Sequence, residues 1–495
     1  MSEISILTTK QKTELHKAIL QYVEPLLKDS GNEETISKLN EILEIDHGSL
    51  NSIIPNYLEK KWSTVLRLQK RILDLENDLS NLKSSMEVHE VQEIVNAKGK
   101  INWIPASVKQ TFKTQTNQQI TTVSMHPFLP IIVSGCSDGT IIVWNLAVDD
   151  TTPEKIIKAH TRSVNRIVWS KKPLDLTDNG TLEYYFASCS SDLSVRVWNG
   201  SSYKQVRSLM GHEHTVSSLS FSSSNNKILY SVSRDKTIKA WDIVNANCIK
   251  TFVGHSDWVR NLDTVSSPNS SFGDFVISCS NDQSIRISHA ESGNGVSLLI
   301  GHGHVVEDAK FLPLHSNKYI DKFIEKYNQR FQNIPSFLME ESIYEESLGY
   351  KYCISAGRDN SVKLWLLPPP STQPHRPPMP SSYNNSQGWL VDNLLGHTSW
   401  VRSLVVHPNG RFIFSASDDK TIKVWDLDSL VTEGKAKCIR TLTGHEGFVN
   451  CIDFASFEED NKTPLTGEEL LKHIESKMRC LFISGGVDNS VKLWK

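Results

Sequence analysis

Short stretches of alternating apolar and polar residues fill the chain from residue 107 onward, as in TIKVWD (421–426) and SVKLWK (490–495). Alternation with a period of two indicates β-strands that bury one face. Asp-Lys, Asp-Asn or Asp-Gly pairs, which favour hairpin turns, stand between many of these stretches. The pattern predicts an all-β domain of antiparallel strands over residues 107–495.

A fixed set of residues recurs along this domain. An Asp stands six residues before a Trp, a Ser stands four residues before that Asp, and a His followed four residues later by Val lies upstream. The Ser/Asp/Trp sets are Ser134/Asp138/Trp144, Ser188/Asp192/Trp198, Ser231/Asp235/Trp241, Ser355/Asp359/Trp365, Ser415/Asp419/Trp425 and Ser484/Asp488/Trp494, and a seventh copy has Ser278/Asp282 with Ser288 in place of Trp. The His residues are His160, His212, His255, His302, His397 and His445, whereas the first copy has Thr116 there. Seven copies predict seven structural units.

Ser, His and Asp are also the residue types of a catalytic triad, so a hydrolase is one interpretation of this set. An enzyme concentrates its reactive groups at one site, whereas this trio recurs in six units. The repetition favours a buried hydrogen-bond network in which His contacts Asp and Ser, with the Trp indole N–H at its end. His397, Ser415, Asp419 and Trp425 are one such predicted network.

The Gly-His pairs, the S-x-x-x-D spacing and the Trp-Asp pairs at 241–242 and 425–426 resemble the WD40 repeat family over about residues 108–495. The resemblance implies a seven-bladed β-propeller with four antiparallel strands per blade. The last unit lacks an outer strand after Trp494, and SVKQTFK (107–113) is predicted to supply it and to close the ring.

Three insertions lengthen the units, at about 313–349, 366–392 and 456–479, and each is expected to leave the propeller surface. The second contains seven prolines between 368 and 380. Because proline removes backbone donors, this segment is predicted to be an exposed polyproline-like or disordered loop. An inert loop is favoured over a docking site for a proline-reading domain. The third insertion carries a short helical pattern.

Before residue 100 the spacing of apolar residues changes from two to about three and a half. Alternating gaps of three and four over residues 58–90 predict a parallel two-stranded coiled coil. The alternative is an amphipathic helix folded on its own domain. The residues assigned to the dimer seam are Val65, Leu68, Ile72, Leu75, Leu79 and Leu82.

Residues 1–45 are predicted to form short amphipathic helices, followed by a linker at 91–106. The first helix is expected to start near Thr8 or Thr9, and Pro25 is expected to interrupt it. Its apolar face comprises Leu15, Ala18, Ile19, Tyr22 and Val23. Helices this small need a surface on which to bury such a face, and a second copy of the chain provides one, so we expect a homodimer.

Nearly the whole chain resembles the lissencephaly-1 family, called nuclear distribution proteins in fungi. The resemblance is carried by QKTELHKAILQYV (11–23), LEKKWSTVLRLQK (58–70), NWIP (102–105) and the propeller. It implies a LisH-type dimerisation region at 1–45 and a non-enzymatic regulator that helps load cytoplasmic dynein at microtubule plus ends, supporting nuclear migration and mitotic spindle positioning. The implied partners are the dynein heavy chain, a Nudel-type coiled-coil protein, dynactin and a plus-end tracking linker. The implied location is the cytoplasm and cytoskeleton, at plus ends and spindle poles.

Basic and aromatic residues beside the repeated His and Asp concentrate in neighbouring units. Arg and Trp on a rigid rim are typical of binding hot spots; the alternative is a solvated charged rim. The set comprises Arg234, Arg260, Arg358, Trp400 and Lys420, with Trp258 and Arg402 as further candidates. In the lissencephaly-1 family this face contacts the motor ring of dynein, and the resemblance implies the same contact for these residues.

Composition adds several expected absences. The net charge of −3 gives no nucleic-acid footprint, and the chain has no apolar run of about 18 residues, so neither nucleic acid nor membrane insertion is expected. The N-terminus lacks the basic start and apolar core of a secretory signal. Eight cysteines form no CxxC pair, which favours reduced core thiols and no metal or cofactor. The alternative function is a WD40 scaffold or substrate adaptor for another complex, such as a ubiquitin ligase.

Overall fold

A computed structural model of the chain describes residues 9–29, 35, 38–39, 43, 71, 75, 104–114, 117–148, 151–176, 180–267, 272–335, 338, 344, 348–371, 376–380, 387–454 and 480–495. The chain divides into two compact units, Met1–Gly99 and Lys100–Lys495.

In the first unit the helix α1 spans Thr9–Asp29 and continues through Pro25, so the expected interruption is wrong. Proline removes a single backbone donor near the helix end, and the remaining bonds keep the helix continuous. Ala18 is buried, whereas Leu15 and Tyr22 of the predicted apolar face are 41% and 46% exposed. Of the predicted coiled-coil seam only Leu75 lies among the described residues, where it is helical and exposed. Val65, Leu68, Ile72, Leu79 and Leu82 lie outside them.

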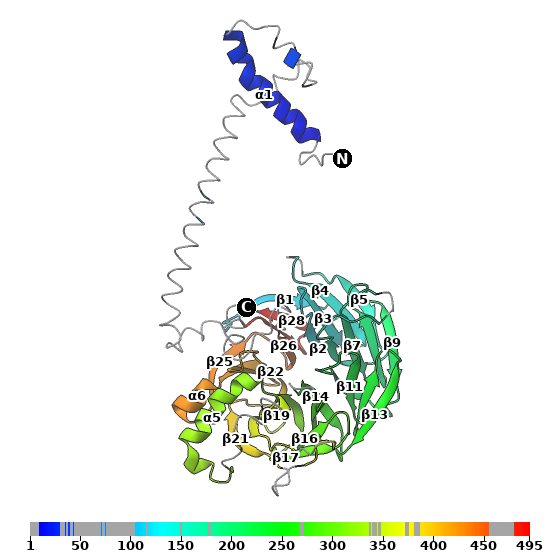
Figure 1. Ribbon diagram of the computed structural model, residues 1–495, viewed down its shortest axis with the longest axis vertical. Helices are drawn as coiled ribbons and strands as arrows, with labels where there is room; N and C mark the ends of the chain where they lie inside the picture. The colour runs from blue at the N-terminus through cyan, green and yellow to red at the C-terminus, as the bar shows by residue number, and fades with distance from the viewer. Residues whose placement is uncertain are drawn as a thin grey trace. The chain divides into compact units, whose positions relative to one another are not determined.

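The second unit is a ring of seven four-stranded antiparallel sheets, as Figure 1 shows. Blades 1 to 6 each use four consecutive strands, with the first strand innermost. Blade 1 comprises β2 (Ile120–Met125), β3 (Ile131–Cys136), β4 (Thr140–Asn145) and β5 (Lys155–Lys158). Blade 2 comprises β6 (Val164–Trp169), β7 (Tyr185–Ser190), β8 (Ser194–Asn199) and β9 (Gln205–Met210). Blade 3 comprises β10 (Val216–Phe221), β11 (Ile228–Ser233), β12 (Thr237–Asp242) and β13 (Asn247–Val253).

Blades 4 to 6 repeat this order. Blade 4 comprises β14 (Val259–Ser266), β15 (Asp274–Ser280), β16 (Ser284–His289) and β17 (Gly295–Ile300). Blade 5 comprises β18 (Val306–Phe311), β19 (Tyr352–Gly357), β20 (Ser361–Leu366) and β21 (Trp389–Leu395). Blade 6 comprises β22 (Val401–Val406), β23 (Phe412–Ser417), β24 (Thr421–Asp426) and β25 (Lys437–Thr443).

Blade 7 closes the ring with strands from both ends of the propeller. It comprises β26 (Val449–Phe454), β27 (Phe482–Gly486), β28 (Ser490–Trp494) and, as its outer strand, β1 (Val108–Lys113). β1 lies beside β28 (Figure 1). The two strands are antiparallel, with Phe112 opposite Val491. The side chain of Phe112 is fully buried. The sequence prediction of closure by residues 107–113 is therefore confirmed, and pairing removes two open sheet edges.

Apolar clusters lie between neighbouring blades. Trp425 of blade 6 belongs to one cluster with Tyr352 and Leu364 of blade 5, and Trp365 of blade 5 belongs to another with Ile287 of blade 4. Because each blade buries the face of the next, the core is a ring of interfaces around the propeller axis.

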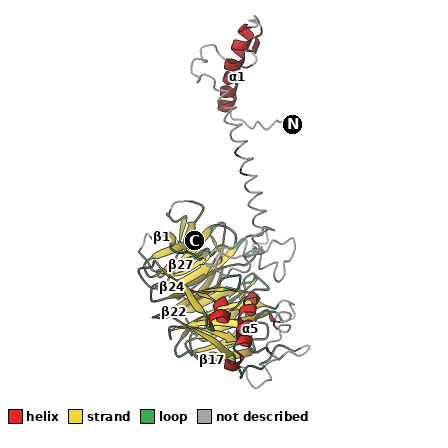
Figure 2. Ribbon diagram, turned by 90° about the vertical axis from the view of Figure 1, so that its left-hand side faces the viewer, coloured by secondary structure: helices red, strands yellow, loops and turns green. Residues whose placement is uncertain are grey.

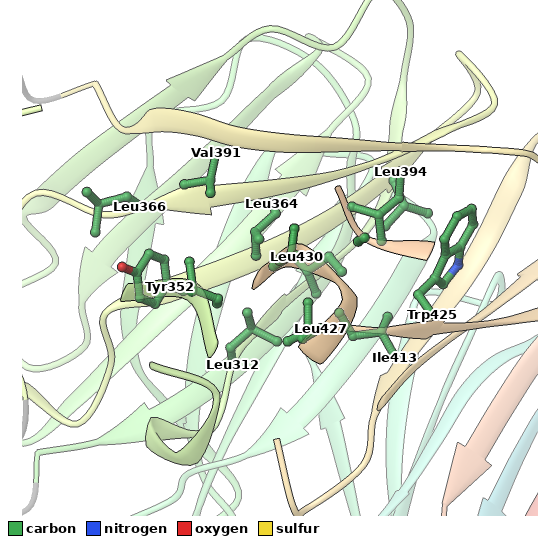
Figure 3. Packing of buried hydrophobic residues seen from close by; sticks show 14 of the residues in the cluster. Leu312, Tyr352, Leu364, Leu366, Val391, Leu394, Ile413, Trp425, Leu427 and Leu430 are labelled. Carbon is green, nitrogen blue, oxygen red and sulfur yellow. The ribbon is translucent and has the colours of Figure 1, made fainter. Parts of the chain in front are cut away.

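The described part of the first insertion packs against the propeller and does not project away from it, contrary to the sequence expectation. Its described part forms η2 (Leu314–Ser316), α5 (Asn317–Lys326) and η3 (Asn328–Arg330), and α5 lies beside α6 (Asp428–Glu433) of blade 6 at the edge of the ring (Figures 1 and 2). Ile320 and Phe323 of α5 join the apolar cluster that contains Leu427 and Leu430, which Figure 3 shows beside Leu312. The helical spacing of these apolar residues gives α5 a face that has to be buried.

The proline-rich insertion differs from its prediction in extent and exposure. β20 ends at Leu366 and β21 begins at Trp389, so the insertion spans 367–388 and not 366–392. In its described part Pro368, Pro370 and Pro378 are buried, because the segment packs back on the propeller instead of forming a fully exposed loop. The third insertion, 456–479, lies outside the described residues.

Candidate functional site

The repeated His, Asp and Ser form one hydrogen-bond network in each of blades 2 to 7, and a Trp joins it in all of these except blade 4. In blades 2 to 7 the His Nδ1 atom lies 2.7–3.0 Å from an Asp oxygen, and Nε2 lies 2.7–2.9 Å from the Ser hydroxyl. In the six units with Trp, the indole N–H donates to the same hydroxyl at 2.8–2.9 Å. In blade 4, where Ser288 replaces Trp, the Ser278 hydroxyl donates to the Arg286 carbonyl at 3.5 Å.

The networks hold the Asp residues ionised. Burial by itself would raise the pKa of Asp192, but hydrogen bonds from Ser194 and the charge and hydrogen bond of His160 lower it to about 2. The pKa of Asp488 is lowered to about 2 in the same way by His445 and Ser490.

The seven Ser side chains have no solvent-exposed surface. Their hydroxyls therefore cannot reach a substrate, and the trio joins strands within a blade instead of forming a hydrolase site.

The turns that carry the Asp residues present side chains at the rim of the propeller. The residue after each Asp has a left-handed backbone conformation, and in blade 6 this residue is Lys420, with φ of 69°. Lys420 is exposed. The seven residues at this turn position are Gly139, Leu193, Lys236, Gln283, Asn360, Lys420 and Asn489.

Three predicted rim residues from blades 3 and 4 form a stack, which we call stack A (Arg234, Trp258 and Arg260). The guanidinium carbon of Arg260 lies 3.7 Å from the centre of the Trp258 ring, and that of Arg234 lies 5.1 Å from it. The indole N–H of Trp258 donates to the Ser217 hydroxyl, which fixes the ring. Two cations on one indole ring form cation–π contacts.

Blades 5 and 6 repeat the arrangement, and we call this set stack B (Arg358, Trp400 and Arg402). The guanidinium carbons of Arg358 and Arg402 lie 4.3 and 5.3 Å from the centre of the Trp400 ring. Trp400 is 36% exposed, so part of its ring faces solvent. In both stacks the first Arg precedes the repeated Asp of one blade, and the Trp and second Arg begin the next blade.

Acidic residues inside the rim distinguish the two stacks. Glu307 accepts a hydrogen bond from Arg358 Nε at 2.5 Å and lies 3.9 Å from Arg260 Nη1. Asp418 accepts two hydrogen bonds from Arg402, both at 2.8 Å. Arg260 instead donates to the neutral Asn281 side chain at 2.6 Å.

The charges shift the arginine pKa values in opposite directions. Burial, together with the charges of Arg358 and Arg402, lowers the pKa of Arg260, although Glu307 opposes this shift. Burial also disfavours the charged form of Arg402, but the hydrogen bonds and charge of Asp418 raise its pKa above the ordinary value. Arg260 is therefore the less fully compensated cation.

The structure brings the predicted rim residues Arg234, Trp258 and Arg260 together in one stack, and Arg358, Trp400 and Arg402 in the other. Sequence reasoning missed Glu307, Asn281 and Asp418, although a signal for them exists. In four blades the fifth residue after the repeated His contacts the residue before the Asp, as Asn165 and Ser191 do at 3.2 Å and as Arg260 and Asn281 do at 2.6 Å. Aligning these two positions between units pairs Glu307 with Arg358 and Arg402 with Asp418.

Among the residues that the structure describes, no group of three or more His, Cys, Asp or Glu side chains is placed to hold a metal ion. No helix in the same set is long and apolar enough to cross a membrane.

Comparison with known proteins identifies the repeats. The profile of the WD40 family (WD domain, G-beta repeat) matches residues 106–145, 151–199, 203–242, 246–287, 388–426 and 436–495. These segments omit most of blade 5, whose strands are separated by two insertions.

Three relatives that match over their full length are named nuclear distribution proteins. The chain is 55% identical to the nuclear distribution protein PAC1 of Debaryomyces hansenii and 51% identical to that of Candida albicans, over the whole of each chain. It is 30% identical to the nuclear distribution protein nudF of Aspergillus niger over 99% of both chains. Together with the seven-bladed propeller, these matches show that the chain belongs to the WD40-repeat family of nuclear distribution proteins.

Proposed function

We propose that the protein is a non-enzymatic, dimeric regulator of cytoplasmic dynein that binds the motor domain through stacks A and B and Lys420. Its role is to promote dynein targeting to microtubule plus ends, in support of nuclear migration and spindle positioning. This role places it in the cytoplasm and on the cytoskeleton, with a Nudel-type protein, dynactin and a plus-end tracking linker as further partners. The name shared by its relatives and the family resemblance support the proposal.

The main observation in support of this binding surface is the pairing of Arg and Trp in two adjacent stacks. Arg and Trp are enriched at the energetic centres of protein interfaces. Their cation–π contacts and the hydrogen bond from Trp258 to Ser217 hold the side chains in place before binding. Preorganised side chains lose less conformational entropy when a partner binds.

Dimerisation is a second part of the proposal. Leu15 and Tyr22 lie seven residues apart, on one side of α1, and each is somewhat less than half exposed in the single chain. A second copy of the N-terminal region would cover them, and the predicted coiled coil at 58–90 would extend the contact. Two linked propellers raise the effective concentration of the second contact with dynein. The propellers can shift the motor only by binding one of its conformational states more tightly.

The binding surface is tested by a charge reversal, Arg260→Glu with Arg358→Glu, in the full-length chain. We expect loss of binding to the purified dynein motor domain with little change in thermal unfolding. Because Glu307 lies between these residues, Arg260→Met with Arg358→Met provides a second variant that adds no acidic group.

The matched control reverses two exposed cations of blades 1 and 2, Lys158→Glu with Arg162→Glu, for the same change in net charge. This control should bind as the unmodified chain does. Unchanged motor binding in both stack variants would refute the proposed surface. Sedimentation of residues 100–495 beside the full chain tests the dimer, which the shorter fragment should lack.

A further inference from the structure

The two stacks have the same geometry but different electrostatic compensation. In stack B both guanidiniums already have carboxylate partners: Arg358 pairs with Glu307, and Arg402 forms two hydrogen bonds with Asp418. The side chains of Glu307 and Asp418 are 9% and 6% exposed, so these pairs are largely shielded from solvent and salt. Stack B with its two acids carries no net charge.

Stack A retains its positive charge. Arg260 lies 3.9 Å from one Glu307 oxygen, and the other oxygen of Glu307 lies closer to Arg358, at 2.5 Å. Arg234 is exposed and has no ion pair within the described part of the chain. Asp257 next to Trp258 turns a carboxylate oxygen to the Trp258 backbone N–H, at 2.6 Å. Stack A therefore presents two cations on a ring that is already fixed.

The two Trp side chains differ in their surroundings, and here stack B is the one with a ring open to a partner. Trp258 lies between Arg234 and Arg260 and its indole N–H is already bonded to Ser217. Trp400 is 36% exposed, with a ring that also lies 6.5 Å from His304. An exposed indole in a ring of neutralised charges favours apolar contact and does not attract ions at a distance.

We propose that the stacks divide the recognition of the partner: stack A binds a carboxylate group of the partner, whereas stack B binds an apolar surface through Trp400. Glu307 and Asp418 are the positioning residues that create the division, because they neutralise stack B and leave stack A charged. This inference rests on the proposed function, since it assigns the chemistry of the surface that would face the motor. It predicts different effects for Arg260 and Arg402, which occupy the same position of the repeat.

The test measures association and dissociation rates for the full-length chain and the purified dynein motor domain over a range of ionic strengths. Arg234→Gln with Arg260→Gln should slow association about tenfold at low ionic strength and flatten its salt dependence, because long-range attraction acts on the association rate. Arg402→Gln with Asp418→Asn removes a neutral pair and should leave the salt dependence unchanged. Trp400→Ala should accelerate dissociation at every ionic strength.

If the stack A variant and the Arg402/Asp418 variant flattened the salt dependence of the association rate equally, the proposed division of roles between the stacks would be overturned. An unchanged salt dependence in the stack A variant would do the same. An oligoglutamate peptide, titrated against the chain with ¹⁵N-labelled tryptophan, separates this inference from the proposed function. The peptide should shift the indole signal of Trp258 and leave that of Trp400 in place even if the motor does not bind. Equal shifts of both signals, or none, would contradict the inference.

Discussion

Replacing Asp419 of blade 6 by Ala should destabilise the propeller through one buried group. Asp419 accepts hydrogen bonds from His397 Nδ1 at 2.7 Å, from the Thr398 backbone N–H at 3.2 Å, and from the backbone and hydroxyl of Thr421 at 2.9 and 2.6 Å. Thr398 is exposed and Thr421 is partly exposed, so water can replace the lost acceptor for these donors. The side chain of His397 is only 1% exposed, so its Nδ1 loses its partner without replacement.

The expected loss follows from this difference. An unsatisfied buried polar group costs about 1–3 kcal/mol, whereas the bonds that water can replace contribute less. Asp138 of blade 1 is the matched control, because it makes the same bonds to Thr140, at 2.9 and 2.6 Å, but is exposed and blade 1 has no repeated His. We therefore expect Asp419→Ala to lower the free energy of unfolding by about 1–3 kcal/mol more than Asp138→Ala does.

Urea unfolding followed by tryptophan fluorescence measures this difference, and hydrogen exchange of the β22 and β23 amides shows whether the loss begins in blade 6. A propeller need not unfold in two states, so exchange provides the local value where the global curve is not a single transition. Equal destabilisation by the two variants would refute the reasoning, because it would mean that the His397 contact contributes nothing to stability.

Two further predictions concern pH and ring closure. The folded-state pKa values of Asp192 and Asp488 are lowered to about 2, so the stability that these groups contribute is present above the unfolded-state pKa near 3.9 and is lost as pH falls toward 2. Asp488→Asn should therefore reduce the drop in the unfolding midpoint between pH 5 and pH 2, and an unchanged drop would contradict this origin of the acid sensitivity. A fragment of residues 104–495 retains β1 and should sediment as a soluble monomer. A fragment of residues 114–495 lacks β1 and its buried Phe112, so it should aggregate through the open edges of blade 7 and the exposed apolar cluster. Equal solubility of the two fragments would contradict the role of β1 in ring closure.

Much of the fold is present in the local pattern of the chain. The spacing of Ser and Asp repeats seven times, with Trp in six of the copies, because each blade needs the same strand length and the same hairpin turn. Ring closure by residues 107–113 could also be inferred, since a set of blades with one missing strand leaves a defined gap. The helical insertion could not be placed in this way. Ile320 and Phe323 have helical spacing, but nothing in that spacing shows that α6 of the next blade covers them.

For the rim residues, too, the sequence determined one part and the tertiary structure another. The sequence by itself determined which Arg and Trp residues stand beside the repeated His and Asp, because repeat positions place side chains at equivalent points of each blade. Only the tertiary structure decided how far each charge is compensated, because Glu307 lies 2.5 Å from Arg358 of its own blade but 3.9 Å from Arg260 of the neighbouring blade. Compensation of a charge depends on distance and on exclusion of water, and both are properties of the packed ring.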